Sequence, residues 1–397
     1  MSSYKEIVLR SGKEASLQRF HPWVFSGAIA RKPEDLVEGE TVRVLAADGT
    51  FLGVGHFQIG SIAVRIMSFV DEPIDAAFYK KSLSNAYRMR SSLNLVRPDN
   101  TIFRLVHGEG DCLPGLIVDI YGDTAVIQAH SVGIHRDLEL VTNALKQILP
   151  TDMVKHIFYK SEGTLPYKAG IFPENSYLSG GEDVDEIAME NGLRFRIDWL
   201  KGQKTGFFVD QRENRALLEY YAKGRHVLNM FCYTGGFSVY ALRGGAASVM
   251  SVDSSAKAVS ITDQNVALNF GEDPRHSSFP EDAFKFLRQL SGGEKDLIIL
   301  DPPAFAKHRG AINNALQGYK KLNLQALQKI APGGFLFTFS CSQVISAEQF
   351  RLAVFSAAAI SGRKVRILHQ LTQPADHPIN IYHPEGEYLK GLVLQVE

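Results

Sequence analysis

Two polar residues that follow apolar runs late in the chain have side chains that could do chemistry. Asp301 begins an Asp-Pro-Pro turn after the run 297–300, and Cys341 lies between two serines after the run 335–339. A thiolate is a strong nucleophile, and a carboxylate can hold a polar group of a substrate. The two runs are typical of short strands buried on both faces of a parallel sheet. If the strands are neighbours, Asp301 and Cys341 emerge at the edge where open α/β sheets bind ligands.

A glycine-containing turn after the predicted strand 226–230 is a candidate cofactor loop. Gly235 and Gly236 allow the backbone to approach a ligand at the start of the helix that follows. The next predicted strand, 248–252, ends in Asp253, about 20 residues after the glycine turn. A carboxylate in this position can accept hydrogen bonds from both ribose hydroxyls of an adenosine cofactor.

Two cofactor classes fit this geometry. A dinucleotide usually requires the complete Gly-x-Gly-x-x-Gly motif around its pyrophosphate, whereas this loop has only two adjacent glycines. S-adenosylmethionine has no phosphate and tolerates a looser loop, so the sequence favours it over a nicotinamide cofactor. Asp282, after a third predicted strand, can accept a hydrogen bond from the adenine amino group. It can equally cap the predicted helix 283–290.

Composition indicates a soluble globular protein of two or three domains. The 397 residues include 43 basic and 43 acidic side chains, so any attraction to nucleic acid must come from local patches. The first 32 residues carry six basic side chains against two acidic ones, which fits a phosphate-binding patch and a solvated face equally well. The basic residues are Lys5, Arg10, Lys13, Arg19, Arg31 and Lys32.

The three cysteines are widely spaced, as in neither a disulfide framework nor a zinc site. We expect Cys232, inside the candidate cofactor loop, to be a packing residue and Cys112 to be an inert loop thiol. The N-terminus lacks a signal-peptide pattern, and no apolar run approaches the roughly 20 residues that a bilayer requires. These features favour a reducing cytoplasm and no metal site.

Turn signals and periodicity divide the chain into three predicted regions. Residues 1–72 alternate short strands with glycine turns, which indicates a small β barrel. Residues 73–186 begin with a helix and form an α+β domain, with 174–186 as a plausible linker. Residues 187–397 open with an Asn-Gly hairpin, and the alternation of strands and helices after it predicts a doubly wound, mostly parallel sheet.

The barrel region resembles a PUA domain, a small RNA-binding barrel, through the segments 21–29 and 48–55. Its His21 and Trp23 are expected to be packing residues rather than RNA contacts. Five further motifs occur in the order found in the ribosomal large subunit methyltransferase I type family, and with the barrel this resemblance spans essentially the whole chain. The motifs are KTGFFVDQR at 204–212, NMFCYTGGF at 229–237, VD at 252–253, DPPAF at 301–305 and FSCS at 339–342.

That family makes 5-methylcytosine in 23S ribosomal RNA, so the resemblance implies a Rossmann-like class I methyltransferase domain, S-adenosylmethionine, an RNA substrate and a homodimer. Carbon 5 of a pyrimidine is a poor nucleophile, and a thiolate must first add to carbon 6. Cys341 is the predicted nucleophile, and Asp301 is predicted to hydrogen-bond ring nitrogen 3. The strand-end argument and the motifs together predict the cofactor-binding residues Gln211, Arg212, Asn229, Phe231, Tyr233, Gly235, Gly236, Asp253, Ser254 and Asp282.

Alternative functions remain open at this point. Methyltransferases that act on exocyclic amines use a similar Asp-Pro-Pro-aromatic turn, although here Ala304 intervenes and Phe305 is shifted by one position. Uracil reacts through the same thiolate adduct as cytosine, and a non-catalytic RNA-binding module is a third reading. The turn at Asp301 lacks the second cysteine of many RNA cytosine methyltransferases, which leaves the base that removes the carbon-5 proton unassigned.

Several further residues carry weaker expectations. A basic group soon after Asp301 is as suited to gripping an RNA backbone as to being merely solvated; it comprises Lys307, His308, Arg309, Lys320 and Lys321. The segment 382–390 resembles the closing hairpin of the family. His377 and His383 are expected to be structural.

Overall fold

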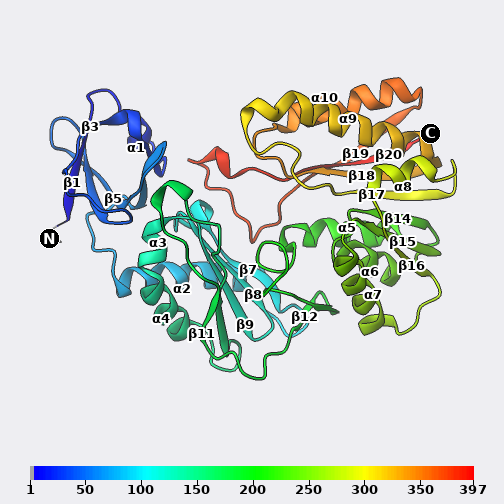
Figure 1. The fold of residues 1–397 in the computed structure, drawn as a ribbon, viewed down its shortest axis with the longest axis horizontal. Helices are drawn as coiled ribbons and strands as arrows, with labels where there is room; N and C mark the ends of the chain where they lie inside the picture. The colour runs from blue at the N-terminus through cyan, green and yellow to red at the C-terminus, as the bar shows by residue number, and fades with distance from the viewer. Residues whose placement is uncertain (1–3) are drawn as a thin grey trace. The chain divides into compact units, whose positions relative to one another are not determined.

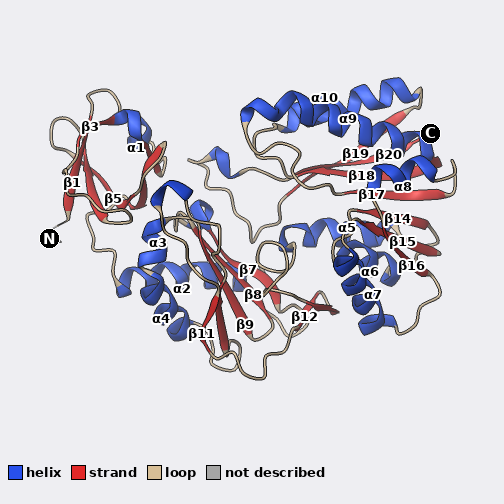
Figure 2. Cartoon of the chain, in the orientation of Figure 1, coloured by secondary structure: helices blue, strands red, loops and turns tan. Residues whose placement is uncertain are grey.

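The computed structural model describes residues 4–397, which form two compact units (Figures 1 and 2). Unit 1 contains the described residues up to Asn191 together with Ile197–Val209 and Ala375–Gly386. Unit 2 contains Gly192–Arg196, Asp210–Pro374 and Glu387–Glu397. The predicted domain boundaries at residues 72 and 186 remain predictions.

Unit 1 begins with a six-stranded sheet in the order β2-β6-β5-β4-β1-β3. Its elements are β1 (Lys5–Leu9), α1 (Ala15–Gln18), β2 (Trp23–Phe25), β3 (Ile29–Arg31), β4 (Thr41–Leu45), β5 (Phe51–Phe57) and β6 (Ile62–Ser68). The inward residues of the alternating pattern, such as Val42 and Val44, are fully buried. Gly55 is required where the strands cross, because a Cβ there would lie 2.1 Å from the carbonyl oxygen of Arg65. The predicted small barrel is therefore confirmed.

The second part of unit 1 packs helices on a five-stranded sheet in the order β11-β10-β9-β8-β7. Its elements are α2 (Ala76–Ser92), β7 (Ile102–His107), β8 (Leu116–Tyr121), β9 (Thr124–Ala129), α3 (Val132–Arg136), α4 (Leu138–Ile148), β10 (His156–Tyr159) and β11 (Ser176–Ser179). Asp75 caps α2 by accepting hydrogen bonds from the amides of Ala77 and Phe78. The predicted linker at 174–186 is wrong in part, because β11 pairs antiparallel with β10 within it.

A buried polar network joins strands and loops of unit 1. Arg104 donates to both carboxylate oxygens of Asp119, at 2.7 and 2.8 Å. Asp119 also accepts a hydrogen bond of 2.6 Å from Thr205, which lies 2.8 Å from the hydroxyl of Tyr121. Asp119, Tyr121 and Thr205 are all fully buried. Thr205 of the KTGFFVDQR motif is therefore used to hold this network together.

Unit 2 is a seven-stranded sheet in the order β16-β15-β14-β17-β18-β20-β19, in which the pairs from β16 to β18 are parallel and β20 is antiparallel to both neighbours. Its strands are β14 (His226–Met230), β15 (Ser248–Asp253), β16 (His276–Pro280), β17 (Lys295–Leu300), β18 (Ile330–Ser340), β19 (Val365–Thr372) and β20 (Lys390–Val396). This mostly parallel, doubly wound sheet confirms the predicted Rossmann-like domain.

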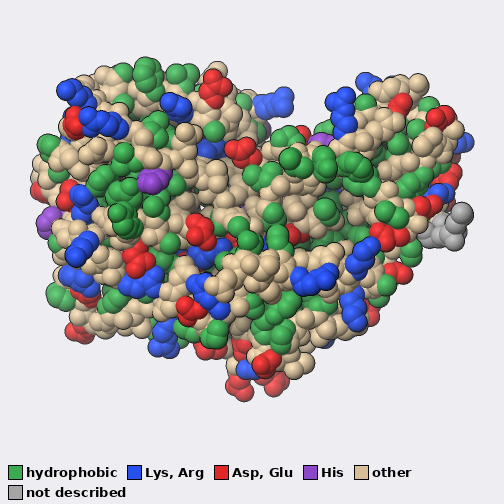
Figure 3. Space-filling view, turned by 180° about the vertical axis from the view of Figure 1, so that it is seen from behind, with side chains coloured by type: hydrophobic (Ala, Val, Ile, Leu, Met, Phe, Trp, Pro, Cys, Tyr) green, Lys and Arg blue, Asp and Glu red, His purple; other side chains and the backbone are tan. Residues whose placement is uncertain are grey.

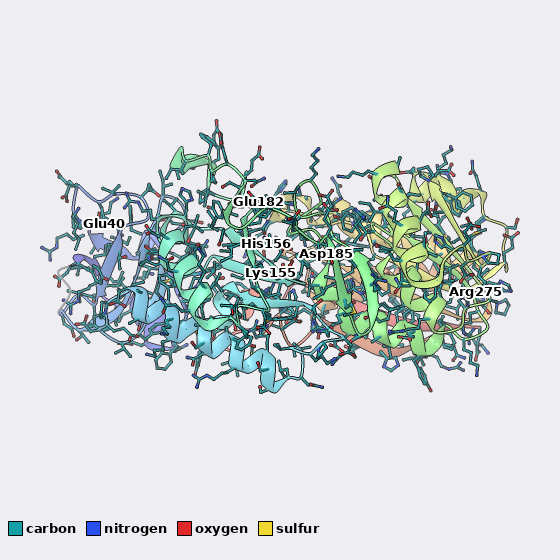
Figure 4. The ribbon with its side chains drawn as sticks, turned by 90° about the horizontal axis from the view of Figure 1, so that it is seen from below. Glu40, Lys155, His156, Glu182, Asp185 and Arg275 are labelled. Atoms are coloured by element: carbon teal, nitrogen blue, oxygen red, sulfur yellow. The ribbon has the colours of Figure 1, made fainter. Side chains whose placement is uncertain are left out.

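Helices cover both faces of the sheet of unit 2. As Figure 1 shows, α8, α9 and α10 lie on one face and α5, α6 and α7 on the other. Their bounds are α5 (Arg212–Tyr221), α6 (Gly236–Arg243), α7 (Ala256–Phe270), α8 (Ala283–Gln289), α9 (Ile312–Lys329) and α10 (Ala347–Ser361). Arg275, labelled in Figure 4, ties the loop before β16 to the end of α6 through the carbonyls of Leu242 and Ala246.

Two further expectations concern the connections. The Asn-Gly turn at 191–192 joins β12 (Ile187–Glu190) to β13 (Leu193–Arg196), as the hairpin signal predicts. The segment 382–390 is the last part of the connection between the antiparallel strands β19 and β20, and it contains one short 3-10 turn, Pro384–Gly386. Among residues 4–397, no helix is long and apolar enough to cross a membrane.

Candidate active site at the carboxyl edge of the unit 2 sheet

The predicted site residues lie at one edge of the unit 2 sheet. Leu300 of β17 pairs with Thr338 of β18 and with Met230 of β14, and Met230 pairs in turn with Val252 of β15. All four strands are parallel, so the residues that follow them share the carboxyl edge. Sequence reasoning was right to bring Asp301 to the same edge as the cysteine that follows β18.

The loop after β14 has an unusual backbone that the end of β15 holds in place. Phe231, Tyr233 and Gly235 all have positive φ angles, of 59°, 47° and 80°. The amide of Tyr233 donates to Asp253 at 3.0 Å, and the other carboxylate oxygen of Asp253 accepts from the amide of Ser255 at 2.9 Å. Non-glycine residues with positive φ are costly and cluster at functional sites. The predicted carboxylate thus also organises the predicted cofactor loop.

Gly235 leaves room for the helix that packs behind this loop. A Cβ added at Gly235 would lie 2.5 Å from Cγ2 of Thr262 on α7, and the positive φ adds backbone strain for any other residue. Thr262 cannot swing away freely, because its hydroxyl lies 2.9 Å from the carbonyl oxygen of Tyr233 and 3.1 Å from that of Ala258, to one of which it donates. The clash at Gly236 would be milder, since a Cβ there would lie 3.0 Å from Cδ of Arg215.

A buried chain of hydrogen bonds lies beneath the loop. Asn229, at 0% exposure, donates to Ser238 at 2.9 Å, and Ser238 lies 2.7 Å from Ser251 of β15. Within residues 4–397 the carboxamide oxygen of Asn229 has no hydrogen-bond partner although it is buried. An unsatisfied buried acceptor beside a strained loop and a strand-end carboxylate fits an adenosine-type cofactor with polar groups to donate.

The surroundings of four other predicted cofactor residues do not by themselves indicate a cofactor contact. Gln211 and Arg212 are almost fully buried at the start of α5, where Gln211 accepts a hydrogen bond of 2.6 Å from Asn214. Ser254 is exposed after Asp253. Asp282 caps α8 by accepting from the amide of Lys285 at 2.9 Å, as the capping interpretation predicted. Cofactor contacts by these four residues stay predictions.

The turns after β17 and β18 are tied to each other. Cys341 is half-buried, and its Sγ lies 3.9 Å from the carbonyl oxygen of Pro302. The hydroxyl of Ser342 accepts from the amide of Ala306 at 3.3 Å and lies 2.9 Å from the hydroxyl of Tyr319. The ring of Phe237, in the first turn of α6, lies 5.7 Å from that of Phe339. A thiol, the Asp-Pro-Pro turn and the start of the cofactor helix therefore meet at one place.

Phe305, the aromatic residue of the Asp-Pro-Pro turn, packs against the neighbouring helix α9. The ring of Phe305 lies 4.6 Å from that of Tyr319 on α9, and its Cδ2 would be 3.0 Å from a Cβ at Gly318. An amine methyltransferase would require an aromatic ring at this turn to be free for stacking on the base. Phe305 does not meet that requirement in this conformation.

Two titratable groups near the site have strongly shifted pKa values. Burial raises the pKa of Cys232 to about 12, which makes it an inert thiol, in agreement with its predicted packing role. Burial lowers the pKa of Lys390 to about 8, and the charge of Cys341 acts in the opposite direction. Sequence reasoning missed Lys390, because a lysine at the end of a segment that resembles a closing hairpin normally indicates a solvated charge.

A second group of possible ligands lies in unit 1. The ligand atoms of His21, His383 and Glu385 lie within 4.8 Å of one another. The amide of Trp23 donates to Nδ1 of His21 at 3.2 Å, so a neutral His21 carries its hydrogen on Nε2, 3.4 Å from Glu385. That nitrogen then has no lone pair for a metal. The ring of His383 lies 4.3 Å from that of Trp23, and the group is a packed, hydrogen-bonded cluster.

Comparisons with known proteins agree with both parts of the fold. Residues 103–381 match the family model of S-adenosylmethionine-dependent methyltransferases, and residues 7–69 match that of PUA-like domains. A Streptococcus mutans protein assigned as an S-adenosylmethionine-dependent methyltransferase is 22% identical, with a TM-score of 0.82 over 99% of this chain and 100% of that one. A methyltransferase solved in complex with S-adenosylhomocysteine has a TM-score of 0.83 at 22% identity over the same shares.

Curated relatives are closer in sequence. Ribosomal RNA large subunit methyltransferase I of Tolumonas auensis is 41% identical over 98% of each chain, and that of Aeromonas hydrophila is 40% identical over the same shares. The agreement covers the barrel, the α+β part and the sheet that carries the site. The chain therefore belongs to the S-adenosylmethionine-dependent methyltransferases and, within them, to the family of ribosomal RNA large subunit methyltransferase I.

Proposed function

We propose that this methyltransferase modifies carbon 5 of a cytosine in 23S ribosomal RNA, with Cys341 as the nucleophile. The observation that carries the proposal is the approach of the Cys341 thiol to the Asp-Pro-Pro turn, with Sγ 3.9 Å from the carbonyl of Pro302. The names of the curated relatives support a large-subunit ribosomal RNA as substrate.

The site residues would act in a fixed order. The Cys341 thiolate forms a bond to carbon 6 of the base, and the π electrons of the ring move to carbon 5. Bound S-adenosylmethionine would supply an electrophilic methyl group, which carbon 5 takes as the methyl–sulfur bond breaks and S-adenosylhomocysteine is left. Loss of the carbon-5 proton to a base then restores the double bond and expels the thiolate. The Asp301 carboxyl group holds ring nitrogen 3 during the addition and favours the charge-relieved adduct.

The cofactor residues would hold the methyl donor beside this thiol. Asp253 would accept from the ribose hydroxyls, and the loop Phe231–Gly236 would cover the donor at the start of α6. Asp282 and Asn229 would hydrogen-bond the adenosine, while Gln211, Arg212 and Ser254 complete the proposed binding set. Support for Asn229 comes from its buried carboxamide oxygen, which lacks a partner within residues 4–397.

The PUA-like barrel would bind RNA, although the basic patch differs from the one that the sequence suggests. Lys5 forms ion pairs with Asp35 and with Glu40, which Figure 4 labels, so its charge is neutralised. Basic and acidic side chains are interspersed over the face drawn in Figure 3, without one broad basic field. RNA binding would then rest on a few exposed groups rather than on net charge.

Exposed aromatic rings of unit 1 support this mode of binding. Phe20 and Tyr382 are 48% and 50% exposed, and their rings lie 5.3 Å apart. Phe20 has a φ of 62°, which is rare for an aromatic residue, and it follows the exposed Arg19. Exposed rings beside a guanidinium group suit the stacking of unpaired bases. On this proposal the barrel holds a single-stranded part of the RNA.

Methylation of a base nitrogen is the competing function. It would use the Asp301 turn with a stacking aromatic residue and would leave Cys341 idle. The packing of Phe305 against Tyr319 at 4.6 Å disfavours it. Carbon 5 of uracil is a second competitor, because the thiolate chemistry is the same. Exposed Lys307, His308 and Arg309, with Lys320 and Lys321, are proposed contacts to the RNA backbone.

The test is the fate of the Cys341→Ala variant. With 23S ribosomal RNA from cells that lack this protein as substrate, the variant should lose methyl transfer at least a thousandfold, and mass analysis of nucleosides should find 5-methylcytosine only with the wild-type protein. Cys112→Ser is the matched control and should keep full activity. Retained turnover of Cys341→Ala, or a methyl group on nitrogen, would refute the proposal.

The resemblance also supports a homodimer, and the spacing of the cysteines supports a cytoplasmic location. Light scattering of the purified protein at micromolar concentration tests this directly, since a dimer has twice the 44.0 kDa mass of the chain. A monomer across the concentration range would remove the dimer from the proposal and leave the chemistry of Cys341 untouched.

A further inference from the structure

Lys390 is buried directly beneath the turn that carries Cys341. It is the first residue of β20 and the cross-strand partner of Ser340, and its side chain is almost inaccessible, with the residue 6% exposed. Its ammonium donates to the carbonyl oxygen of Ser342 at 2.7 Å and to that of Tyr388 at 2.9 Å. The shorter of these two hydrogen bonds places the ammonium against the segment 340–342.

Among the residues that the structure describes, no carboxylate forms a direct ion pair with this charge, although Glu387 is near enough to raise the pKa of Lys390. Within residues 4–397, no Asp or Glu oxygen lies within 4.0 Å of the Lys390 nitrogen, and both of its hydrogen-bond acceptors are neutral. Burying an ammonium without an ion-pair partner is costly, and a methionine of similar length would fill the space without that cost. Packing alone therefore does not explain why a lysine occupies this position.

The titratable groups around Lys390 indicate which of them its ammonium could activate. Its lowered pKa of about 8 results mainly from burial, and Cys341 and Glu387 act against that decrease. Tyr319 on α9 lies beside the same turn, and burial raises its pKa, so that its phenol stays neutral. Asp301 follows the neighbouring strand β17 at the same edge of the sheet. Cys341 is the group among these that gains a reactive charge by losing its proton.

We propose that Lys390 is a positioning residue that keeps Cys341 in the thiolate form by holding an ammonium against the turn 340–342. The proposal rests on the proposed role of Cys341 as nucleophile and deepens it. The interaction is reciprocal, because a cation that is stabilised by a thiolate stabilises that thiolate equally. The nucleophile is then charged before RNA arrives, and the same field receives the thiolate when the product is released.

The test measures the thiolate directly, without methyl transfer. In a Cys112→Ser background, Cys341 is the only accessible thiol, since Cys232 is buried with a pKa of about 12. The rate of iodoacetamide alkylation at Cys341, followed by peptide mass analysis from pH 6 to 10, reports the thiolate fraction. Lys390→Met should slow alkylation at pH 7 roughly tenfold or more and leave the plateau rate at high pH unchanged.

Two further variants separate the charge from the hydrogen bonds. Lys390→Gln keeps a neutral N–H donor toward the carbonyls and should show the same shift of the pH profile as Lys390→Met. Lys295→Met removes another buried lysine, 5% exposed, at the opposite end of the same sheet, and should leave the profile unchanged. Melting curves identify any variant that does not fold, and the Gln variant then carries the test.

The outcomes distinguish this inference from the proposed function. An unshifted alkylation profile in both Lys390 variants would overturn the inference, even if Cys341→Ala abolishes methyl transfer and the proposed function stands. A shifted profile supports it even if Cys341→Ala remains active, in which case the proposed function fails instead. An equal shift of the alkylation profile in Lys295→Met would also overturn the inference, because the shift would then follow from the loss of any buried lysine in this sheet.

Discussion

Arg90 in unit 1 and Lys390 in unit 2 are both buried cations, yet their surroundings differ. Arg90 is 0% exposed; it donates to the Asp111 carboxylate at 2.8 Å and to the carbonyls of Arg104 and Asp376 at the same distance. Lys390 donates to two neutral carbonyls only. A cation that has a full set of hydrogen-bond and ion-pair partners keeps its charge and stabilises the fold. A cation without a carboxylate can respond to a neighbouring acid, as a functional site requires.

A second contrast separates the Arg104 network of unit 1 from the loop after β14 in unit 2. In unit 1, the network of Arg104, Asp119 and Thr205 satisfies its charges internally. In unit 2, the loop after β14 has three residues with positive φ, and Asn229 keeps an unpartnered buried oxygen. Backbone strain and an unsatisfied buried polar atom are features of functional sites, and the loop after β14 combines both. Four substitutions test this difference, in order of expected effect.

Arg90→Met should have the largest effect on stability. It leaves the Asp111 carboxylate, which is 5% exposed, without its cation, and breaking a buried pair in this way costs about 3–5 kcal/mol. Urea unfolding measures the loss, and Arg88→Met, at an exposed position of the same helix, is the control with less than about 0.5 kcal/mol. Equal losses in the two variants would mean that the network in unit 1 does not hold the fold.

Gly235→Ala should come second. The added Cβ would meet Thr262 at 2.5 Å in a backbone with φ of 80°, which should cost about 2–4 kcal/mol and displace the cofactor loop. Gly224→Ala has a similar φ of 73° with open space around it, so it should cost only about 1 kcal/mol. Urea unfolding and calorimetric binding of S-adenosylmethionine measure both effects. Normal cofactor binding by the Gly235 variant would contradict a cofactor role for this loop.

Lys390→Met should stabilise the protein at neutral pH, in contrast to Arg90→Met. The folded-state pKa of about 8 lies below the ordinary 10.5, so the unfolded chain binds more protons between these values. Below about pH 8 the wild-type protein is therefore destabilised by the full free energy of burying the Lys390 ammonium, and it recovers stability as the pH rises toward 10.5. The variant's advantage, of order 2 kcal/mol at pH 7, should shrink over that window. An advantage that is independent of pH would contradict a pKa of about 8 for Lys390.

Tyr319→Phe should have the smallest effect. It removes the hydroxyl that lies 2.9 Å from Ser342, while Ser342 keeps the amide of Ala306 as a donor. The loss should be about 1 kcal/mol of stability, measured by thermal unfolding. Because the phenol is neutral, the pH profile of Cys341 alkylation should move far less than in Lys390→Met. A comparable shift would mean that Tyr319, and not Lys390, controls the thiol.

Some of these features could be predicted from the sequence because they depend on local pattern. The apolar runs before Asp301 and Cys341 have the length and composition of parallel strands, and parallel strands fix which edge their ends share. Asp253 and Asp282 were predicted from their spacing after a strand, and the structure adds the capping and loop bonds that they make.

Other features depend on contacts between distant segments. Lys390 lies 48 residues from Ser342, and its role appears only because β20 enters the sheet beside β18. Thr205 and Asp119 are 86 residues apart, so the motif around Thr205 could not be divided into cofactor and structural residues from sequence. β11 was missed because acidic and glycine residues surround it, and its pairing with β10 overrides that composition.

The place of β20 between β18 and β19 also has a consequence for the order in which the protein matures. While the chain is being synthesised, β18 and β19 both emerge before the strand that joins them. Until residues 390–396 are made, the nascent protein has an unpaired strand edge, a target for chaperones, and no ammonium beneath its cysteine. The thiol therefore has the partner that we propose keeps it ionised only once β20 has paired with β18.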